Sequence, residues 1–189
     1  MPSVIESLQL DRSRTVLSVV DYQERLFAVM DTAHRERALQ NVRILLEAAR
    51  VLSIPVVATE QYPKGLGRTI PEVVEAFPTL KAIEKTEFAC PDNAEFMHVL
   101  EGLRRPTVLL AGMETHICVY QTALKLLEKG YLVHVIADAC LSRRKLNWKT
   151  GLRQCDRAGA VVTTAESAVF QLLGRAGTDE FRAVSKLVK

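Results

Sequence analysis

The sequence predicts an α/β protein: a single-domain, doubly wound, Rossmann-like sheet of six parallel strands with helices on both faces. Two patterns favour this fold. Short runs rich in β-branched residues alternate with longer stretches of helical period along the chain, and reactive side chains stand directly after several of these runs. With 189 residues, 48% hydrophobic and 25% charged, the composition is that of one domain that buries a core. We expect residues 1–189 to form this domain, with residues 1–14 as a short soluble leader.

Six short apolar segments predict the strands of the sheet. They cover residues 15–20, 55–59, 80–84, 107–111, 132–137 and 160–163. Between the first two segments, apolar residues recur at spacings of three and four, which predicts a helix over 32–52 packed on the sheet. Further helices are predicted over 93–103, 115–129, 145–158, 165–173 and 178–188.

Residues 60–71 predict a long surface loop, because this segment is rich in Gly, Pro, Tyr and Gln and has no helical period. Such loops either connect elements or carry function. Nothing in the residues of this segment decides between the two.

The charge balance and the apolar runs exclude several classes of protein. Twenty-five basic and 22 acidic side chains leave a net charge of +3, and these charges form no block, so a nucleic-acid partner is not expected. No apolar run approaches the roughly 18 residues that span a membrane. The first 14 residues hold Glu6 and Asp11, which is atypical of a transit peptide.

The four cysteines predict neither a disulfide framework nor a zinc site, because they form no C-x-x-C pair and have no metal-ligand spacing. We therefore expect a reducing compartment, cytoplasmic or alternatively mitochondrial. Cys90, Cys140 and Cys155 are interpreted as structural thiols.

Three reactive residues follow predicted strands. Asp21 comes directly after residues 15–20, Lys85 directly after residues 80–84, and Cys118 at the head of the helix that follows residues 107–111. Doubly wound sheets bind ligands beyond the carboxyl ends of their strands, near the point where the strand order reverses. If the first strand neighbours the fourth, Asp21 and Cys118 come from adjacent strand ends.

These residue types can together perform nucleophilic catalysis. If Thr115 caps its helix, Cys118 lies in the first turn, where the helix dipole favours thiolate, and a nearby ammonium from Lys85 would lower the thiol pKa further. Asp21 could then carry a proton, and backbone N–H groups of Cys118 and Glu114 could face an oxyanion. Each residue also has an ordinary structural interpretation: a buried Cys, an Asp that caps a turn and a solvated Lys.

Three segments resemble the isochorismatase-like cysteine hydrolases, a family that includes nicotinamidases and N-carbamoylsarcosine amidase. They are VVDYQERL around Asp21, KTEFAC from Lys85 and LLAGMETHICVYQTA around Cys118, in the family's order and spacing, and the resemblance extends from residue 15 to about residue 173. It implies that Cys118 attacks a carbonyl, that Asp21 acts as general base and then acid, and that Lys85 stabilises the thiolate. It also implies a cis peptide bond between Met113 and Glu114, which would aim the Glu114 and Cys118 amides at an oxyanion.

Departures from better-known members limit the substrate. Nicotinamidases carry an Asp-x-His metal motif where this chain has TEQYPKGLGRT, without histidine, so we expect no catalytic metal, no cofactor and no nicotinamide substrate. Isochorismatases proper lack the cysteine, so Cys118 argues against isochorismate. The segments TEQYPKGLGRT and GMETHICV most resemble the isochorismatase domain-containing subgroup, some of whose trypanosomatid relatives carry a mitochondrion-associated ribonuclease label.

Other residues in or near these motifs are candidates for a substrate pocket. They are Gln23, Tyr22, Phe27, Tyr62 and Phe88, with core packing as the alternative for Phe27 and Phe88. The Glu114 side chain could select an amine or fix its turn, and His116 could touch a substrate or cap the helix. Trp148 and the cluster Arg143, Arg144 and Lys145 belong either to a subunit contact or to a solvated helix start, and the second interpretation is favoured.

The resemblance leads to three hypotheses. The first is metal-independent hydrolysis of a C–N bond in a small amide, carbamoyl or ureido compound, through a covalent intermediate on Cys118. The second is an RNA-associated protein or ribonuclease, and the third is a scaffold that keeps the fold with little activity. For the first we expect a small-molecule substrate, a homo-oligomer that is at least a dimer, and neither a membrane nor a nucleic-acid partner.

Overall fold

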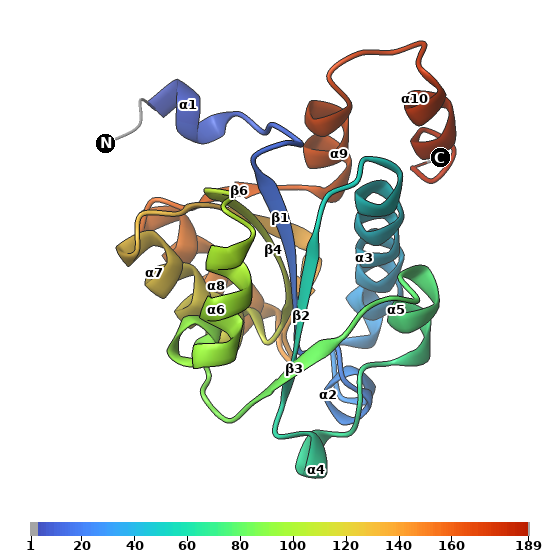
Figure 1. Cartoon of the computed structure of the whole chain (residues 1–189). Coiled ribbons are helices and arrows are strands. Elements are labelled where there is room, and N and C mark those ends of the chain that lie inside the picture. The colour runs from blue at the N-terminus through green and yellow to red at the C-terminus, as the bar shows by residue number, and fades with distance from the viewer. Residues whose placement is uncertain (1–3, 189) are drawn as a thin grey trace.

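One six-stranded sheet forms the centre of the protein, seen in a computed structural model that describes residues 4–188. The strands are β1 (Thr15–Val20), β2 (Val56–Gln61), β3 (Ala82–Lys85), β4 (Thr107–Met113), β5 (Leu132–Leu141) and β6 (Val161–Thr163) (Figure 1). Their order is β3-β2-β1-β4-β5-β6, and every neighbouring pair is parallel. The chain thus winds outward from β1 to β3 and then returns to β4, so the strand order reverses between β1 and β4.

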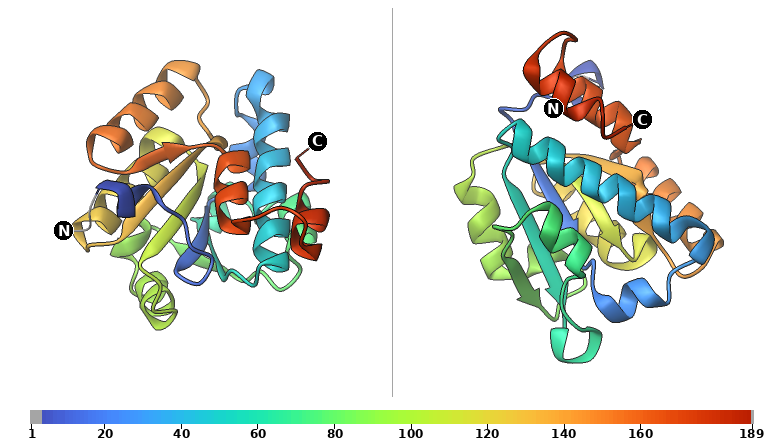
Figure 2. Two further views of the ribbon diagram at one scale, coloured as in Figure 1. Left: turned by 90° about the horizontal axis from the view of Figure 1, so that it is seen from above. Right: turned by 90° about the vertical axis from the view of Figure 1, so that its right-hand side faces the viewer.

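Helices cover both faces of this sheet, as the sequence predicts. On one face lie α2 (Glu24–Ala28), α3 (Thr32–Val51), α5 (Pro71–Ala76), α9 (Ala165–Leu173) and α10 (Asp179–Val184) (Figures 1 and 2). On the other lie α6 (Ala94–Gly102), α7 (Tyr120–Glu128) and α8 (Lys145–Arg157). The short elements are α1 (Val4–Leu8), α4 (Pro63–Leu66), the 3-10 turn η1 (Cys90–Asp92) and the π turn η2 (Thr115–Val119).

The central strands are buried on both faces, which is why they read as continuous apolar runs. Successive side chains of a strand point to opposite faces, so Leu17 and Val19 of β1 join the core under α3 while Val16 and Val20 join the core under α6 and α7. Both cores therefore fix the orientation of β1. The residue that follows β1 is placed at the centre of the sheet's carboxyl edge.

The structure differs from the predicted elements mainly in short segments. The predicted loop over 60–71 contains the end of β2, the helix α4 and the first residue of α5. The helices α1, α2 and α4 have four or five residues each, too few positions for a helical period to show in sequence. The predicted helix over 115–129 is divided into η2 and α7, β5 continues to Leu141, and the helix predicted over 178–188 ends at Val184.

No helix in the described part of the chain combines the length and the apolar character needed to cross a bilayer.

Candidate active site

Asp21, Lys85 and Cys118 meet at the carboxyl edge of the sheet. Asp21 follows β1, Lys85 ends β3 and Cys118 lies in η2 after β4, and all three are buried, with at most 4% of each residue exposed. The ammonium of Lys85 donates a hydrogen bond to Asp21 Oδ2 over 2.8 Å. The charges of Asp21 and Lys85 both act on the buried thiol of Cys118. The structure therefore brings together the three residues that the sequence singles out.

Asp21 is held by backbone and side chain alike. Its φ of 55° lies in the left-handed region, which an Asp adopts more readily than most residues, and its N–H donates to Thr59 O over 3.1 Å. The hydroxyl of Thr59, itself buried, donates to Asp21 Oδ1 over 2.7 Å. With Lys85 on the other oxygen, each carboxylate oxygen has a donor within the fold.

Lys85 uses all three N–H donors of its ammonium inside the fold. Besides Asp21 Oδ2, the acceptors are Gln61 Oε1 at 2.6 Å and Glu87 O at 3.2 Å. Burial by itself would lower the pKa of Lys85, but the charge of Asp21 and the nearby thiols raise it above the ordinary value. Lys85 is therefore a fixed positive charge that acts on the neighbouring thiol through space.

Gln23 and Gln61 form a clamp next to this group. The Gln23 amide nitrogen donates to Gln61 O over 3.0 Å and to Gly67 O over 2.7 Å, and Gln61 N–H donates back to Gln23 Oε1 over 2.7 Å. Gln61 Nε2 donates to Thr86 O over 2.8 Å, which leaves its oxygen directed at Lys85. The pocket role of Gln23 stays a prediction; its side chain is fully buried and bound to backbone.

The turn that carries Cys118 differs from the predicted helix start. Thr115 does not cap it, because the Thr115 hydroxyl donates to Leu141 O over 2.9 Å on the neighbouring strand. The expected lowering of the thiol pKa is also not found. Burial raises the pKa of Cys118 and the charge of Asp21 raises it further, while Lys85 offsets only part of both effects. These effects favour the protonated thiol of Cys118 over the thiolate.

Residues that follow β5 hold η2, the turn that carries Cys118, in place. The buried Glu114 carboxylate accepts hydrogen bonds from the Arg143 N–H at 3.0 Å and from its guanidinium at 3.1 Å. His116 Nδ1 lies 3.1 Å from Ser142 Oγ, and its Nε2 lies 3.2 Å from Asn147 Nδ2. Glu114 thus has the structural role that was one of its two interpretations, and His116 links the turn to α8. The Met113–Glu114 peptide bond is cis.

Cys90, which the sequence analysis interpreted as a structural thiol, lies next to this group of residues. It is fully buried, and its sulfur lies 3.8 Å from the Thr59 hydroxyl that bonds Asp21. Burial raises the pKa of Cys90 to about 11, with Lys85 lowering it and Asp21 raising it. The sequence feature that could have placed Cys90 near the site is its position in the segment KTEFAC, five residues after Lys85.

Of the remaining pocket candidates, Tyr22 and Phe27 pack in the core, whereas Tyr62 and Phe88 lie at the surface. Tyr22 is 1% exposed, packs in the core and donates its hydroxyl to Ala139 O over 2.9 Å, so its pocket role stays a prediction. Phe27 is partly buried against the same core, as its alternative interpretation had it. Tyr62 and Phe88 are each 55% exposed, and Tyr62 lines a hollow whose wall includes Lys85 and Glu87. Tyr62 therefore lies at the surface beside the end of β3 that carries Lys85.

Within residues 4–188, no set of three or more His, Cys, Asp or Glu side chains is arranged to hold a metal ion.

Fold and site first define a class: an α/β protein whose reactive side chains gather where a doubly wound sheet reverses its strand order, the place where such sheets bind ligands. Comparison with known families then narrows this class. Residues 15–167 match the isochorismatase domain, so the chain belongs to the isochorismatase family and is a hydrolase of that family.

Relatives and solved structures agree with this assignment. The chain is 38% identical over 179 residues to a secreted isochorismatase effector, Isc1, of Phytophthora sojae, covering 93% of this chain and 84% of that protein. It is 42% identical over 146 residues to isochorismatase domain-containing protein 2 of Xenopus laevis, covering 76% and 69%.

Two solved structures have the same fold. A structure described as MAR1 ribonuclease from Caenorhabditis elegans is 35% identical and superposes with a TM-score of 0.88 over 95% of this chain and 92% of that chain. The YcaC product of Escherichia coli, described as an octameric hydrolase of unknown specificity, has a TM-score of 0.89 over 99% and 90%. At 23% identity, the second likeness shows the fold alone.

Proposed function

We propose that this chain is a metal-independent cysteine hydrolase that cleaves the C–N bond of a small amide, carbamoyl or ureido compound through a covalent intermediate on Cys118. The observation that carries the proposal is that the buried Cys118 thiol lies under the charge of Asp21, whose carboxylate is held by Lys85 and Thr59. A thiol paired with a carboxylate can pass its proton on as it attacks, so a stable thiolate is not needed beforehand.

The proposed reaction has two halves. Cys118 Sγ bonds to the substrate carbonyl carbon while its proton passes to Asp21, and the C–N bond breaks as Asp21 returns that proton to the leaving nitrogen. A water molecule then gives a proton to Asp21 and attacks the thioester-type carbonyl, and the sulfur leaves as the thiol. Lys85 keeps Asp21 in place throughout, and the backbone N–H groups of Glu114 and Cys118 would stabilise the oxyanion.

The test is turnover of a panel of small amides, carbamoyl compounds and ureas by wild type and two variants. Cys118→Ala should reduce turnover by at least about a thousandfold, because the nucleophile is lost. Cys155→Ala is the matched control, since Cys155 is a buried thiol of α8 outside the group and should leave turnover nearly unchanged. Full turnover by Cys118→Ala would contradict the mechanism.

The ribonuclease description of the C. elegans structure suggests a second measurement on the same protein. A protein that binds RNA through its phosphates loses affinity steeply as salt is added, because counterions are released on binding. The hydrolase proposal expects no measurable RNA binding even at low salt, in line with the small net charge of +3. RNA cleavage that survives Cys118→Ala would point to the alternative function.

We also propose that the chain assembles at least into a homodimer, supported by the octameric state described for the E. coli protein of the same fold. Light scattering should then report a mass of at least twice the 21.1 kDa of one chain. A mass of one chain at micromolar concentration would contradict this.

A further inference from the structure

Among the strands that carry site residues, β3 has the least support from the sheet. It stands at the edge next to β2, whereas β1, β2 and β4 each lie between two strands, and its four residues end at Lys85. The register pairs Glu60 with Glu84 and Gln61 with Lys85. Because successive side chains of a strand point to opposite faces, Glu84 lies on the face opposite to Lys85. The place of Lys85 in the site therefore depends on what holds this short edge strand.

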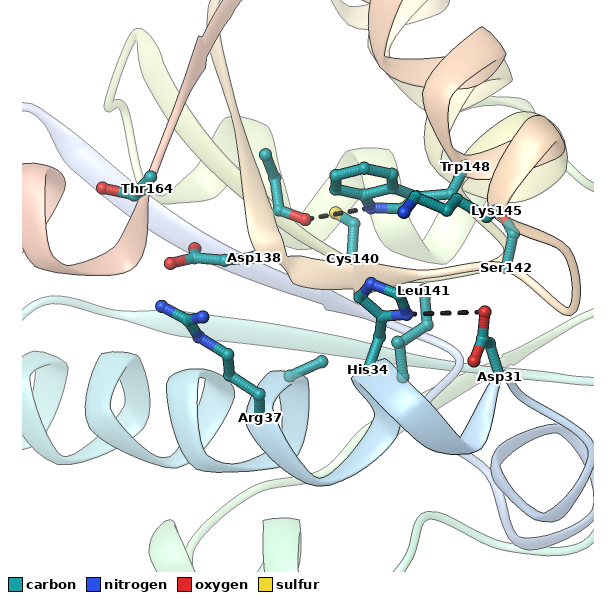
Figure 3. A pocket seen from close by; sticks show the side chains of 12 residues that line it. Asp31, His34, Arg37, Asp138, Cys140, Leu141, Ser142, Lys145, Trp148 and Thr164 are labelled. Atoms are coloured by element: carbon teal, nitrogen blue, oxygen red, sulfur yellow. Dashed lines mark hydrogen bonds and ion pairs between the residues drawn. The ribbon is translucent and has the colours of Figure 1, made fainter.

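The other flank of the carboxyl edge shows how an inner strand is supported. Strand β5 lies between β4 and β6, and a hollow of about 310 Å³ beside its end is lined by His34 of α3 and Trp148 of α8 (Figure 3). The two rings stack on each other with centroids 6.2 Å apart, and the indole N–H donates to Ala137 O of β5 over 3.1 Å. Two neighbouring strands and two helices thus hold the end of β5. At β3 an ion bridge provides the support instead.

This bridge is a single guanidinium that joins β3 to β2 on the face opposite to Lys85. Nη1 of Arg68 donates to Glu60 Oε2 of β2 over 2.8 Å and to Glu84 Oε1 of β3 over 2.6 Å. The two carboxylates belong to the paired positions that directly precede the pair of Gln61 and Lys85. The Arg68 bridge and the hydrogen bond from Lys85 to Gln61 therefore hold the same end of β3 from its two faces.

Arg68 is more firmly placed than an ordinary surface arginine. Its carbonyl oxygen accepts the Glu24 N–H at 3.0 Å, and the N–H and hydroxyl of Thr69 donate to Glu60 Oε1 at 2.7 and 2.8 Å. The Glu60 side chain is only 6% exposed. Burial by itself raises the pKa of Glu60, but the donors from Thr69 and Arg68 outweigh it and hold this pKa below its ordinary value. Exposed ion pairs gain little because two mobile side chains must be ordered, and here the backbone and Glu60 already order Arg68.

We propose that Arg68 is a positioning residue of this site: it holds the end of β3 in register from the outer face and so keeps the Lys85 ammonium against Asp21. Arg68 acts through Lys85 and takes no part in the chemistry itself. The consequence for turnover rests on the proposed function, whereas the placement of Lys85 can be measured whether or not the chain is a hydrolase.

The ammonium protons of Lys85 give the readout. All three are bound inside the fold, so they should exchange slowly enough with water to give a ¹H–¹⁵N ammonium signal at low temperature, and the loss of this signal in Lys85→Met assigns it. The variants are Arg68→Gln, which removes the bridge, Arg68→Lys, which keeps the charge, and Glu84→Gln, which releases β3 alone. Arg12→Gln is the matched control, because Arg12 is a half-exposed arginine that pairs with Glu180 and lies outside β3.

Exchange of the Lys85 protons should accelerate by at least about threefold in Arg68→Gln and in Glu84→Gln, and no further in the double variant, because both changes break the same link. Arg68→Lys should retain most of the protection and Arg12→Gln all of it. Turnover of a substrate should fall in the same order, through kcat with little change in KM.

Exchange at the wild-type rate in Arg68→Gln or in Glu84→Gln would overturn the positioning role, as would an equal acceleration in Arg12→Gln. If exchange follows the expected order but wild type hydrolyses no compound of the amide and urea panel, the positioning role of Arg68 stands and the proposed function fails.

Discussion

Lys85 is a cation without a spare donor, because Asp21, Gln61 and Glu87 take its three N–H groups. It therefore serves the site by position and charge. Both it and Asp21 have side chains that are fully buried, and removing one partner of a buried pair leaves an unpaired charge in the interior.

Lys85→Met should accordingly lower the free energy of unfolding by about 3–5 kcal/mol, because Asp21 loses its counter-ion in the interior. Urea denaturation followed by circular dichroism measures this. Lys64→Met, at an exposed lysine of α4, is the control and should change stability by less than about 0.5 kcal/mol. An equal loss of stability in the two variants would show that the buried pair of Lys85 and Asp21 does not stabilise the fold.

The raised pKa of Cys118 gives a pH prediction of definite sign. Thiolate is the species that iodoacetamide alkylates, so modification of Cys118 should be slow at pH 7 and accelerate as the pH rises above 8. Asp21→Asn removes the negative charge that helps to raise this pKa and should move the profile to lower pH. Mass mapping of the alkylated peptides distinguishes Cys118 from the other three thiols. Rapid modification of Cys118 at pH 6 would contradict the prediction, because it would mean that the thiolate is already populated and that the pKa of Cys118 is not raised.

Thr59 tests whether the carboxylate needs both of its donors. Thr59→Val keeps the shape but removes the hydroxyl that donates to Asp21 Oδ1, which should cost about 1–3 kcal/mol of stability and slow turnover. Thr59→Ser keeps the hydroxyl and should retain most of both. If the two variants behave alike in turnover and in denaturation, the hydrogen bond has no role in holding Asp21.

Among the elements, α8 packs directly against η2, the turn that carries Cys118. A Cβ on Gly151 would lie 2.8 Å from Thr115 O and 2.9 Å from His116 Cα, closer than real contacts allow, and both atoms belong to backbone. The absence of a side chain at this position lets α8 approach η2. The sequence shows Gly151 only as an unfavourable residue inside a helix, without the reason for it.

Gly151→Ala should therefore displace η2 and reduce turnover, with a loss of about 1–3 kcal/mol in stability from overpacking. Gly102→Ala in α6 is the matched helical glycine, because a Cβ there meets nothing within 4 Å. That substitution should leave turnover unchanged and stabilise by up to about 1 kcal/mol. Wild-type turnover by Gly151→Ala would show that η2 can shift to accept the extra methyl group without any effect on activity.

Sequence patterns predicted the long elements well and the short ones poorly. The strand Thr15–Val20 and the helix Ala165–Leu173 have the predicted bounds. A strand buried on both faces is a continuous apolar run, and a helix with one buried stripe has a periodic pattern. The π turn η2 has no such signal. The burial of Tyr22 and Gln23 could not be predicted either, because the left-handed φ at Asp21 turns the chain and adjacency in sequence does not tell which way the next side chains face.

At the scale of the whole molecule, the site depends on four neighbouring strands. Asp21 follows β1, Thr59 and Gln61 lie on β2, Lys85 ends β3 and Cys118 follows β4. The neighbouring positions of β1 and β4 are those of the common doubly wound order, which the sequence analysis took as its condition. The clamp of Gln23 and Gln61 could not, because it joins residues 38 positions apart through backbone atoms.

Strand β3 stands at the edge of the sheet and has four residues, so it makes ladder contacts on one side only. Residue 61 of β2 is paired with residue 85 of β3, and the same two residues share the hydrogen bond from Lys85 to Gln61. A slip of this pairing by one residue would turn Lys85 to the opposite face of the sheet and present Glu84 or Thr86 to Asp21. A carboxylate facing a buried carboxylate is strongly unfavourable, and a threonine leaves the charge unmatched. The buried ion pair of Lys85 and Asp21 therefore favours the native register of β3 over a register shifted by one residue, because only the native pairing places an ammonium next to the carboxylate.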